Sequence, residues 1–319
     1  MKTIRLENIN REDVIGLDIQ HGHIVASHFR RERNKLILGQ LAIGEYDENA
    51  SEKQLALAIR ALWKKEKLPT RTVNTCLHSH SLLIRYFHYE NLTEDELPQA
   101  LALEAEEALQ YPANQISIDW QLDPRTGAKK PGTTQLSGTL IAAPRNIVEK
   151  HLNLIQSAGL YSIRVETSCS ALSNLYSVFV KNEAIIPVCL INLSERSADI
   201  IMSSKDGSYP RTLFSTDSLW EHNIDYLLEN IQNSLLYYHI KLKNPPIEKI
   251  ILAGRIPSAG DLLKKRLEQE TRLPIEVLDI YDNPRLPCAQ NLQNQRPQHS
   301  LNVATGIGLG LQKDDYELV

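Results

Sequence analysis

The sequence predicts an α/β protein built from two similar halves. In the first half, alternating apolar residues indicate three strands, an amphipathic helix and a further strand. The second half repeats that order, and such a repetition is typical of two domains with one architecture. The predicted ranges are strands 14–19, 22–29 and 34–43, helix 51–67 and strand run 73–90, then strands 186–192, 197–203 and 208–215, helix 219–242, strand 248–253 and helix 259–272.

Between the two halves, the chain holds further elements that interrupt the repeat. A helix that stops before Pro112 precedes a hairpin, whose strands flank a loop rich in Pro, Gly and Lys. These elements predict an α/β subdomain over about 73–145, inserted into the first half. The other predicted ranges are hairpin strands 116–122 and 135–142, helix 145–159, strand 161–166, helix 168–181, strand 275–278 and a glycine-rich helix 302–310.

The composition limits the class of protein. A chain of 319 residues is long enough for two domains with cores of their own. Its net charge of −4 gives no whole-chain reason to expect nucleic-acid binding. The first residues lack an apolar signal core, and no stretch approaches the roughly 20 apolar residues that span a bilayer. We therefore expect a cytoplasmic protein that reaches a membrane only through partners.

Three strand–turn segments organise the chain. Gly16–Ile19 runs into the turn Gln20–His23, a similar segment covers Val188–Ile200, and a third covers Ile250–Arg255. Their order resembles the two phosphate loops and the adenosine motif of the actin-like ATPase fold. That resemblance implies two ribonuclease-H-like domains that flank a cleft. The expected domains are 1–165, with the insertion, and 166–319, whose C-terminal helix at about 300–312 packs back on the first domain.

The first loop keeps one residue of such a nucleotide site and changes others. In the actin-like fold, an aspartate here holds Mg²⁺ through water, and small residues let backbone N–H groups approach the phosphates. Asp18 matches that aspartate and is the magnesium ligand if Mg²⁺ binds. Gln20 stands where glycine is usual, His21 stands where a small residue is usual, and Gly22 follows.

The second and third segments are also altered. Asn192 replaces the second aspartate, and Ser194 replaces a glycine. Arg196 and Ser197 follow in the same loop. In the adenosine motif Gly254 fits the pattern, while Arg255 stands where a second glycine is usual. Together with the first loop, these residues form the predicted site for ATP and magnesium, in a degenerate form.

Two groups of residues have competing interpretations. Glu166 resembles the acidic residue that positions the attacking water, so Asp18 and Glu166 are the catalytic candidates; the alternative for Glu166 is a solvated strand end. Four histidines come in His-x-His pairs on strand-like runs, and with no third ligand in the pattern we predict surface or core histidines rather than a metal site. These are His21, His23, His78 and His80.

Several segments in order give a closer resemblance. Leu92–Pro98 is followed by Ala105–Pro112, then Ile141–Arg145 by a helix that ends in Ser157–Leu160, and Ile231–Tyr238 comes before the adenosine strand. This series resembles the PilM family of type IV pilus assembly proteins and, more weakly, the cytoplasmic part of the type II secretion protein GspL and the division protein FtsA.

The resemblance implies a cytoplasmic scaffold of type IV pilus, or related type II secretion, assembly. It also implies a partner, the N-terminal cytoplasmic peptide of a PilN-like inner-membrane protein, received in the groove between the first domain and the inserted subdomain, and it allows a homo-oligomer. The surfaces suggested for that peptide are the strand 82–89 and the helix 97–111. Two other functions stay open at this point, an active or weak ATPase of the same fold and a sugar-kinase-like transferase. The transferase needs a glycine-rich loop with a catalytic aspartate, which we do not find, and nucleotide binding separates the ATPase from the scaffold.

Overall fold

A computed structural model gives the fold of the chain. It describes residues 13–32, 35–123, 135–180, 186–194, 197–205, 207–214, 224–254, 260–278, 280–281, 286–289, 292 and 303–311. Across these residues, the helices are all too short or too polar to pass through a lipid bilayer.

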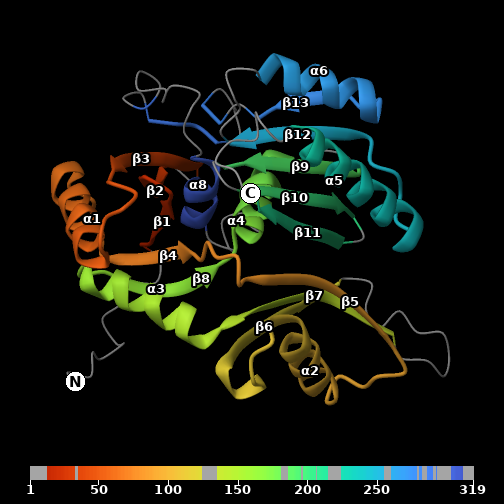
Figure 1. The fold of residues 1–319 in the computed structure, drawn as a ribbon. Helices are drawn as coiled ribbons and strands as arrows, with labels where there is room; N and C mark the ends of the chain where they lie inside the picture. Colours follow the sequence, from red (N-terminus) through yellow and green to blue (C-terminus); the bar gives the residue numbers. More distant parts are fainter. Residues whose placement is uncertain are drawn as a thin grey trace.

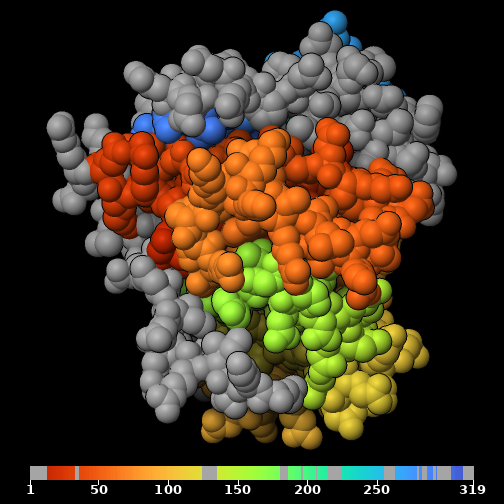
Figure 2. Space-filling model, turned by 90° about the vertical axis from the view of Figure 1, so that its left-hand side faces the viewer, coloured from red at the N-terminus to blue at the C-terminus, as the bar shows by residue number. Residues whose placement is uncertain are grey.

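The first half is built around a sheet of five strands in the order β3-β2-β1-β4-β8. β2 pairs antiparallel with β1 and β3, whereas β4 pairs parallel with β1 and β8. Helices α1 (Glu52–Glu66) and α3 (Arg145–Ser157) cover its outer face, where they lie side by side (Figure 2). The strands are β1 Ile15–Gln20, β2 His23–Glu32, β3 Lys35–Glu45, β4 Thr72–Cys76 and β8 Tyr161–Glu166.

The second half repeats this topology strand for strand. Its sheet has the order β11-β10-β9-β12-β13, with the same sequence of antiparallel and parallel pairs. Helices α5 (Ile224–Leu236) and α6 (Gly260–Thr271) pack on its outer face. A π-helical turn at Tyr237–Lys241 follows α5. The strands are β9 Val188–Leu193, β10 Ser197–Ser204, β11 Gly207–Phe214, β12 Lys249–Gly254 and β13 Ile275–Val277.

A separate sheet of three strands stands below the first sheet (Figure 1). It has the order β5-β7-β6, and α2 (Leu97–Leu109) packs on it through Leu97 and Leu101. The predicted run 73–90 is therefore two strands, because β4 belongs to the first sheet and β5 to this one. The strands are β5 Leu83–Glu90, β6 Ile116–Leu122 and β7 Gln135–Pro144, with a short 3-10 helix at Ala113–Gln115 before β6.

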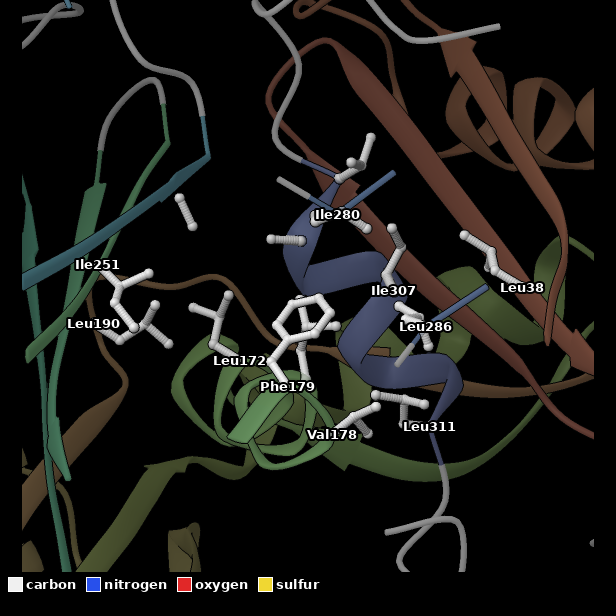
Figure 3. Packing of buried hydrophobic residues seen from close by; sticks show 14 of the residues in the cluster. Leu38, Leu172, Val178, Phe179, Leu190, Ile251, Ile280, Leu286, Ile307 and Leu311 are labelled. Carbon is white, nitrogen blue, oxygen red and sulfur yellow. The ribbon is translucent and has the colours of Figure 1, made fainter. Parts of the chain in front are cut away.

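Two helices, α4 (Ser168–Val180) and α8 (Ala304–Gly310), lie between the five-stranded sheets (Figure 1). They share one apolar core with both sheets, so Leu38 of β3, Leu172 of α4, Ile251 of β12 and Ile307 of α8 belong to a single buried cluster (Figure 3). The order through the molecule is thus helices, sheet, the α4 and α8 layer, sheet and helices. From the repeated topology, we propose the division into the domains 1–165 and 166–319.

Helix α8 fits between its neighbours because three of its residues are glycines. A β-carbon on Gly306 would lie 2.6 Å from Cγ1 of Val25 in β2, and one on Gly310 would overlap the Ser27 hydroxyl. A β-carbon on Gly308 would overlap the backbone carbonyl of Ala171 in α4. Helix α8 therefore packs directly against side chains of β2 on one face and against the backbone of α4 on the other.

Candidate functional site

The turn after β1 is closed by contacts of its own. The backbone N–H of Tyr46 donates to the carbonyl of Gly22 (3.0 Å), and the Tyr46 hydroxyl donates to the carbonyl of Gln20 (2.7 Å). Nε2 of His21 lies 2.6 Å from Oε2 of Glu48. Gly22 has φ +76°, a left-handed conformation that favours glycine. These contacts hold the predicted phosphate loop against the segment that follows β3.

Asp18 is fully buried, and both of its carboxylate oxygens have partners. Nε2 of Gln20 donates to Oδ2 (2.6 Å), and Nε2 of His78 lies 2.6 Å from Oδ1. The pairing of β1 with β4 explains the second contact. Leu17 faces Thr75, so the next residues, Asp18 and Cys76, are neighbours at the ends of two parallel strands, and His78 lies two residues further on.

The charges at this strand end favour a protonated His78. Burial opposes protonation of His78, but Cys76 and Asp18 together hold its pKa well above the ordinary value. Burial also raises the pKa of Cys76 to about 11, so this residue is a thiol near neutral pH. An imidazolium at His78 whose Nε2 donates to Oδ1 of Asp18 is therefore the expected pair. We predicted His78 as a surface or core histidine, and its link to Asp18 was missed.

The second loop is arranged differently. Asn192, fully buried at the position that corresponds to Asp18, donates through Nδ2 to Oδ2 of Asp199 (3.3 Å). The two residues face each other across the β9–β10 pair. The backbone N–H of Ser194 donates to the carbonyl of Ser197 (2.8 Å), which closes the turn. Arg196 lies outside the described residues.

Asp199 is a buried carboxylate that we did not predict as a site residue. Its Oδ1 accepts hydrogen bonds from the hydroxyls of Ser168 (2.7 Å) and Thr212 (2.8 Å) and faces the Cys169 thiol at 3.6 Å. Ser168 and Cys169 open α4, while Thr212 lies in β11. The carboxylate therefore ties the first turn of α4 to the second sheet. The sequence could have indicated Asp199, because a tight hairpin places it opposite Asn192.

Gly254, the glycine of the third segment, ends β12 with φ +85°. A β-carbon here would overlap the carbonyl of Leu193 and lie 2.7 Å from Oδ1 of Asn192. Only glycine fits this position without a shift, so Gly254 and Asn192 are packed together. Arg255 lies outside the described residues.

Glu166 ends β8, on the side of the first sheet that faces the three-stranded sheet. Its Oε2 accepts hydrogen bonds from the Ser170 hydroxyl (3.0 Å) and from Nδ2 of Asn174 (3.4 Å), both in α4. Burial raises the pKa of this carboxyl group, although these two partners and Arg164 oppose the shift. Glu166 is thus half-buried and held by α4, which differs from a fully solvated strand end.

A groove separates the first sheet from the three-stranded sheet. It has a volume of about 140 Å³ and is mostly apolar. Glu166 and Asp119, both acidic, are the charged residues among those that line it. β6, which supplies Asp119, is an edge strand of the three-stranded sheet. The lining residues are Leu77, Leu82, Ser117, Ile118, Asp119, Ile141, Ala142, Ala143, Val148, Val165, Glu166 and Thr167.

Comparison with known proteins finds solved structures with a similar architecture. A PilM–PilN type IV pilus biogenesis complex superposes with a TM-score of 0.76 at 17% identity, over 93% of this chain and 97% of that chain. A Bacteroides thetaiotaomicron protein with an actin-like ATPase fold and unknown function gives a TM-score of 0.51 at 11% identity, over 89% of this chain and 96% of that one. No curated protein sequence matches the chain.

The repeated sheets and these similarities define an actin-like ATPase fold, as the sequence predicted. Residues 16–212 match a protein family described as type IV pilus assembly protein PilM. This match covers more than half of the chain. The chain belongs to the PilM family.

Proposed function

We propose that this protein is a scaffold of type IV pilus assembly that binds a peptide and does not hydrolyse ATP. Its partner is the N-terminal cytoplasmic segment of a PilN-like inner-membrane protein, which would hold it at the inner face of that membrane. The family supports the pilus role. The name of the similar complex supports the choice of partner.

The observation that carries the loss of hydrolysis is the occupation of Asp18. A magnesium ion held through Asp18 needs at least one free carboxylate oxygen, directly or through water. His78 and Gln20 take both oxygens at 2.6 Å. A protonated His78 also places a positive charge beside Asp18, where the cation would otherwise be.

The second loop points the same way. Asn192 carries no charge, and its amide is engaged with Asp199. The residues present therefore do not fit a magnesium–nucleotide complex held in the manner of the actin-like fold, and we derive no catalytic step through one.

The groove between the two sheets is the best candidate for the peptide. An extended peptide can pair with the edge strand β6 through its backbone while its side chains enter the apolar groove. Acidic Asp119 and Glu166 favour a peptide with basic residues. The surfaces suggested by the sequence are less available, since β5 contacts β11 and α2 buries Leu97 and Leu101 in the core.

A binding assay tests this proposal. The fluorescently labelled N-terminal peptide of a PilN-like protein from the same organism is titrated with the full protein, and a scrambled peptide serves as the reference. Val148→Arg in α3 and Asp119→Lys in β6 should each weaken binding by about tenfold or more. The matched controls are Leu103→Arg and Glu106→Lys on the exposed face of α2, which should bind as the wild type does. Binding that follows the control positions instead contradicts the proposal.

A further inference from the structure

Three potential metal ligands of different chemistry meet at the ends of β1 and β4. A carboxylate oxygen of Asp18, the sulfur of Cys76 and a ring nitrogen of His78 all lie within 4.8 Å of one another. The fold fixes this arrangement, because Asp18 and Cys76 are neighbours on adjacent parallel strands. His78 follows Cys76 by two residues, the spacing that returns a side chain to the same face of an extended chain.

The surroundings suit a metal ion that enters from one side. Asp18 is fully buried and Cys76 is 1% exposed, so two ligands are fixed by packing. Cys76 packs against Ala171 of α4 and Leu309 of α8. The His78 side chain is 29% exposed, which opens the cluster to solvent on its side. Three protein ligands with one open side are the usual arrangement of a zinc site that keeps a bound water.

We propose that Asp18, Cys76 and His78 bind one Zn²⁺ ion, with water from the open side as the fourth ligand. The mixed set of oxygen, sulfur and nitrogen selects zinc over magnesium or calcium, which prefer oxygen ligands alone. This is a site separate in chemistry from the magnesium–nucleotide site of the actin-like fold, although it uses the same aspartate. It does not depend on the peptide groove.

Binding of the zinc ion releases the protons that Cys76 and His78 carry in the metal-free protein. The Cys76 thiol loses its proton to solvent as the sulfur–zinc bond forms, and a protonated His78 loses its proton as the ring nitrogen turns from Asp18 to the metal. Without zinc, the hydrogen bond between His78 and Asp18 satisfies the buried carboxylate. With zinc, the metal takes that place, so the carboxylate has a partner in both states.

Zinc uptake by the full chain tests the proposal. The protein, freed of any affinity tag and treated with a chelator, is titrated with Zn²⁺ against a chromophoric competitor, and Co²⁺ then replaces zinc for absorption spectra. We expect one tight ion per chain and a thiolate-to-cobalt charge-transfer band. Cys76→Ser should abolish that band, and His78→Gln should weaken zinc binding by at least about tenfold.

Matched controls separate these ligands from other groups. His80→Gln changes the next histidine in the same connection, and Cys189→Ala removes another buried thiol, so both should bind zinc as the wild type does. His78 is partly exposed, so its variant keeps the fold even if Cys76→Ser does not. A folded wild type that takes up no zinc, or a His78→Gln variant with unchanged affinity, overturns the proposal. Neither result bears on peptide binding or ATP hydrolysis, which have their own assays.

Discussion

Nε2 of His78 lies 2.6 Å from Oδ1 of Asp18, across the ends of two parallel strands. The resemblance to the actin-like fold assigns this aspartate to a hydrated magnesium ion. Here its first neighbour is a side chain of the same chain, and Gln20 holds the other oxygen. The aspartate thus pairs with side chains of its own chain at the strand ends, and the proposed absence of ATP hydrolysis rests on this occupation of its magnesium position.

Loss of His78 should destabilise the metal-free protein. In His78→Ala, buried Asp18 keeps Gln20 but loses its charged partner, and we expect a loss of about 1–3 kcal/mol in the free energy of unfolding. Urea unfolding in the presence of a chelator measures it. The double variant Asp18→Asn/His78→Ala should be more stable than the sum of the two single changes predicts. His88→Ala, at an exposed position of β5, is the control; equal losses at both histidines would refute a specific pair.

ATP hydrolysis should be at background. Since both carboxylate oxygens of Asp18 have partners and Asn192 carries no charge, phosphate release by the wild type should equal that of Asp18→Ala. A fluorescent ATP analogue should bind with a Kd above about 1 mM whether or not Mg²⁺ is present, which is the range of weak, non-specific contacts. Steady phosphate release that disappears in Asp18→Ala would show that the site is active.

The sequence was sufficient to predict the fold but not every sheet assignment. Period-two alternation revealed the strands, and their repeated order revealed the actin-like topology. The run 73–90 was the exception, because alternation continues from β4 into β5 although the chain leaves one sheet for another. Local patterns carry no information about which sheet a strand joins.

The candidate site shows the same limit. Asp18 and Asn192 stand out because each is a polar residue near the end of an apolar strand, shortly before a turn. Their partners do not stand out, since His78 reaches Asp18 only through the pairing of β1 with β4. Asp199 was closer to prediction, because a tight turn between β9 and β10 sets Asn192 opposite it. The groove needs three separate segments in place and has no sequence signal of its own.

A methyl group on Gly308 should destabilise the junction between the two halves. The β-carbon of Gly308→Ala would overlap the carbonyl of Ala171, and neither backbone can yield easily. Overpacking of this kind costs about 1–3 kcal/mol, and the better helix propensity of alanine offsets up to about 1 kcal/mol. Gly44→Ala is the control, since its β-carbon would meet only the Leu62 side chain at 3.4 Å. Urea unfolding midpoints compare the two, and an unchanged Gly308→Ala protein would contradict this packing.

The free energy of unfolding should decrease as the pH is lowered, in a range set by His151. Burial lowers the pKa of His151 to about 4 from its ordinary 6.5, and nearby His78 adds to the shift, while Asp18 opposes it. Its ring Nε2 lies 2.9 Å from the Thr75 hydroxyl. Because the unfolded chain takes up the proton first, the contribution is fully present above pH 6.5 and is lost as the pH falls towards 4. The loss is at most about 3 kcal/mol, since the ring is partly exposed.

His151→Gln keeps a polar partner for Thr75 but cannot take up a proton in this range. Its unfolding free energy should therefore depend less on pH across the same window than that of the wild type. His88→Gln, at an exposed histidine, should leave the slope unchanged. If the unfolding free energies of the wild type and of His151→Gln change equally with pH, His151 is not the cause of the pH dependence.

Restoring the second aspartate of the nucleotide site should fail unless Asp199 changes with it. Asn192→Asp places a second buried carboxylate opposite Asp199, where Nδ2 of Asn192 now donates across 3.3 Å. Two carboxylates at this distance cannot both ionise, so we expect a loss of about 2 kcal/mol or more near neutral pH.

The exchanged pair, Asn192→Asp/Asp199→Asn, should recover most of that stability. It keeps one charge and one amide, and an asparagine oxygen at 199 can still accept from the hydroxyls of Ser168 and Thr212. A double-mutant cycle from urea unfolding should therefore show a favourable coupling of the two changes. Additive losses would mean that Asn192 and Asp199 are not coupled, and that something else in β9 and β10 disfavours a carboxylate at 192. Because only the exchanged pair carries a stable charge at 192, it is also the protein in which any regained affinity for magnesium–nucleotide should be sought.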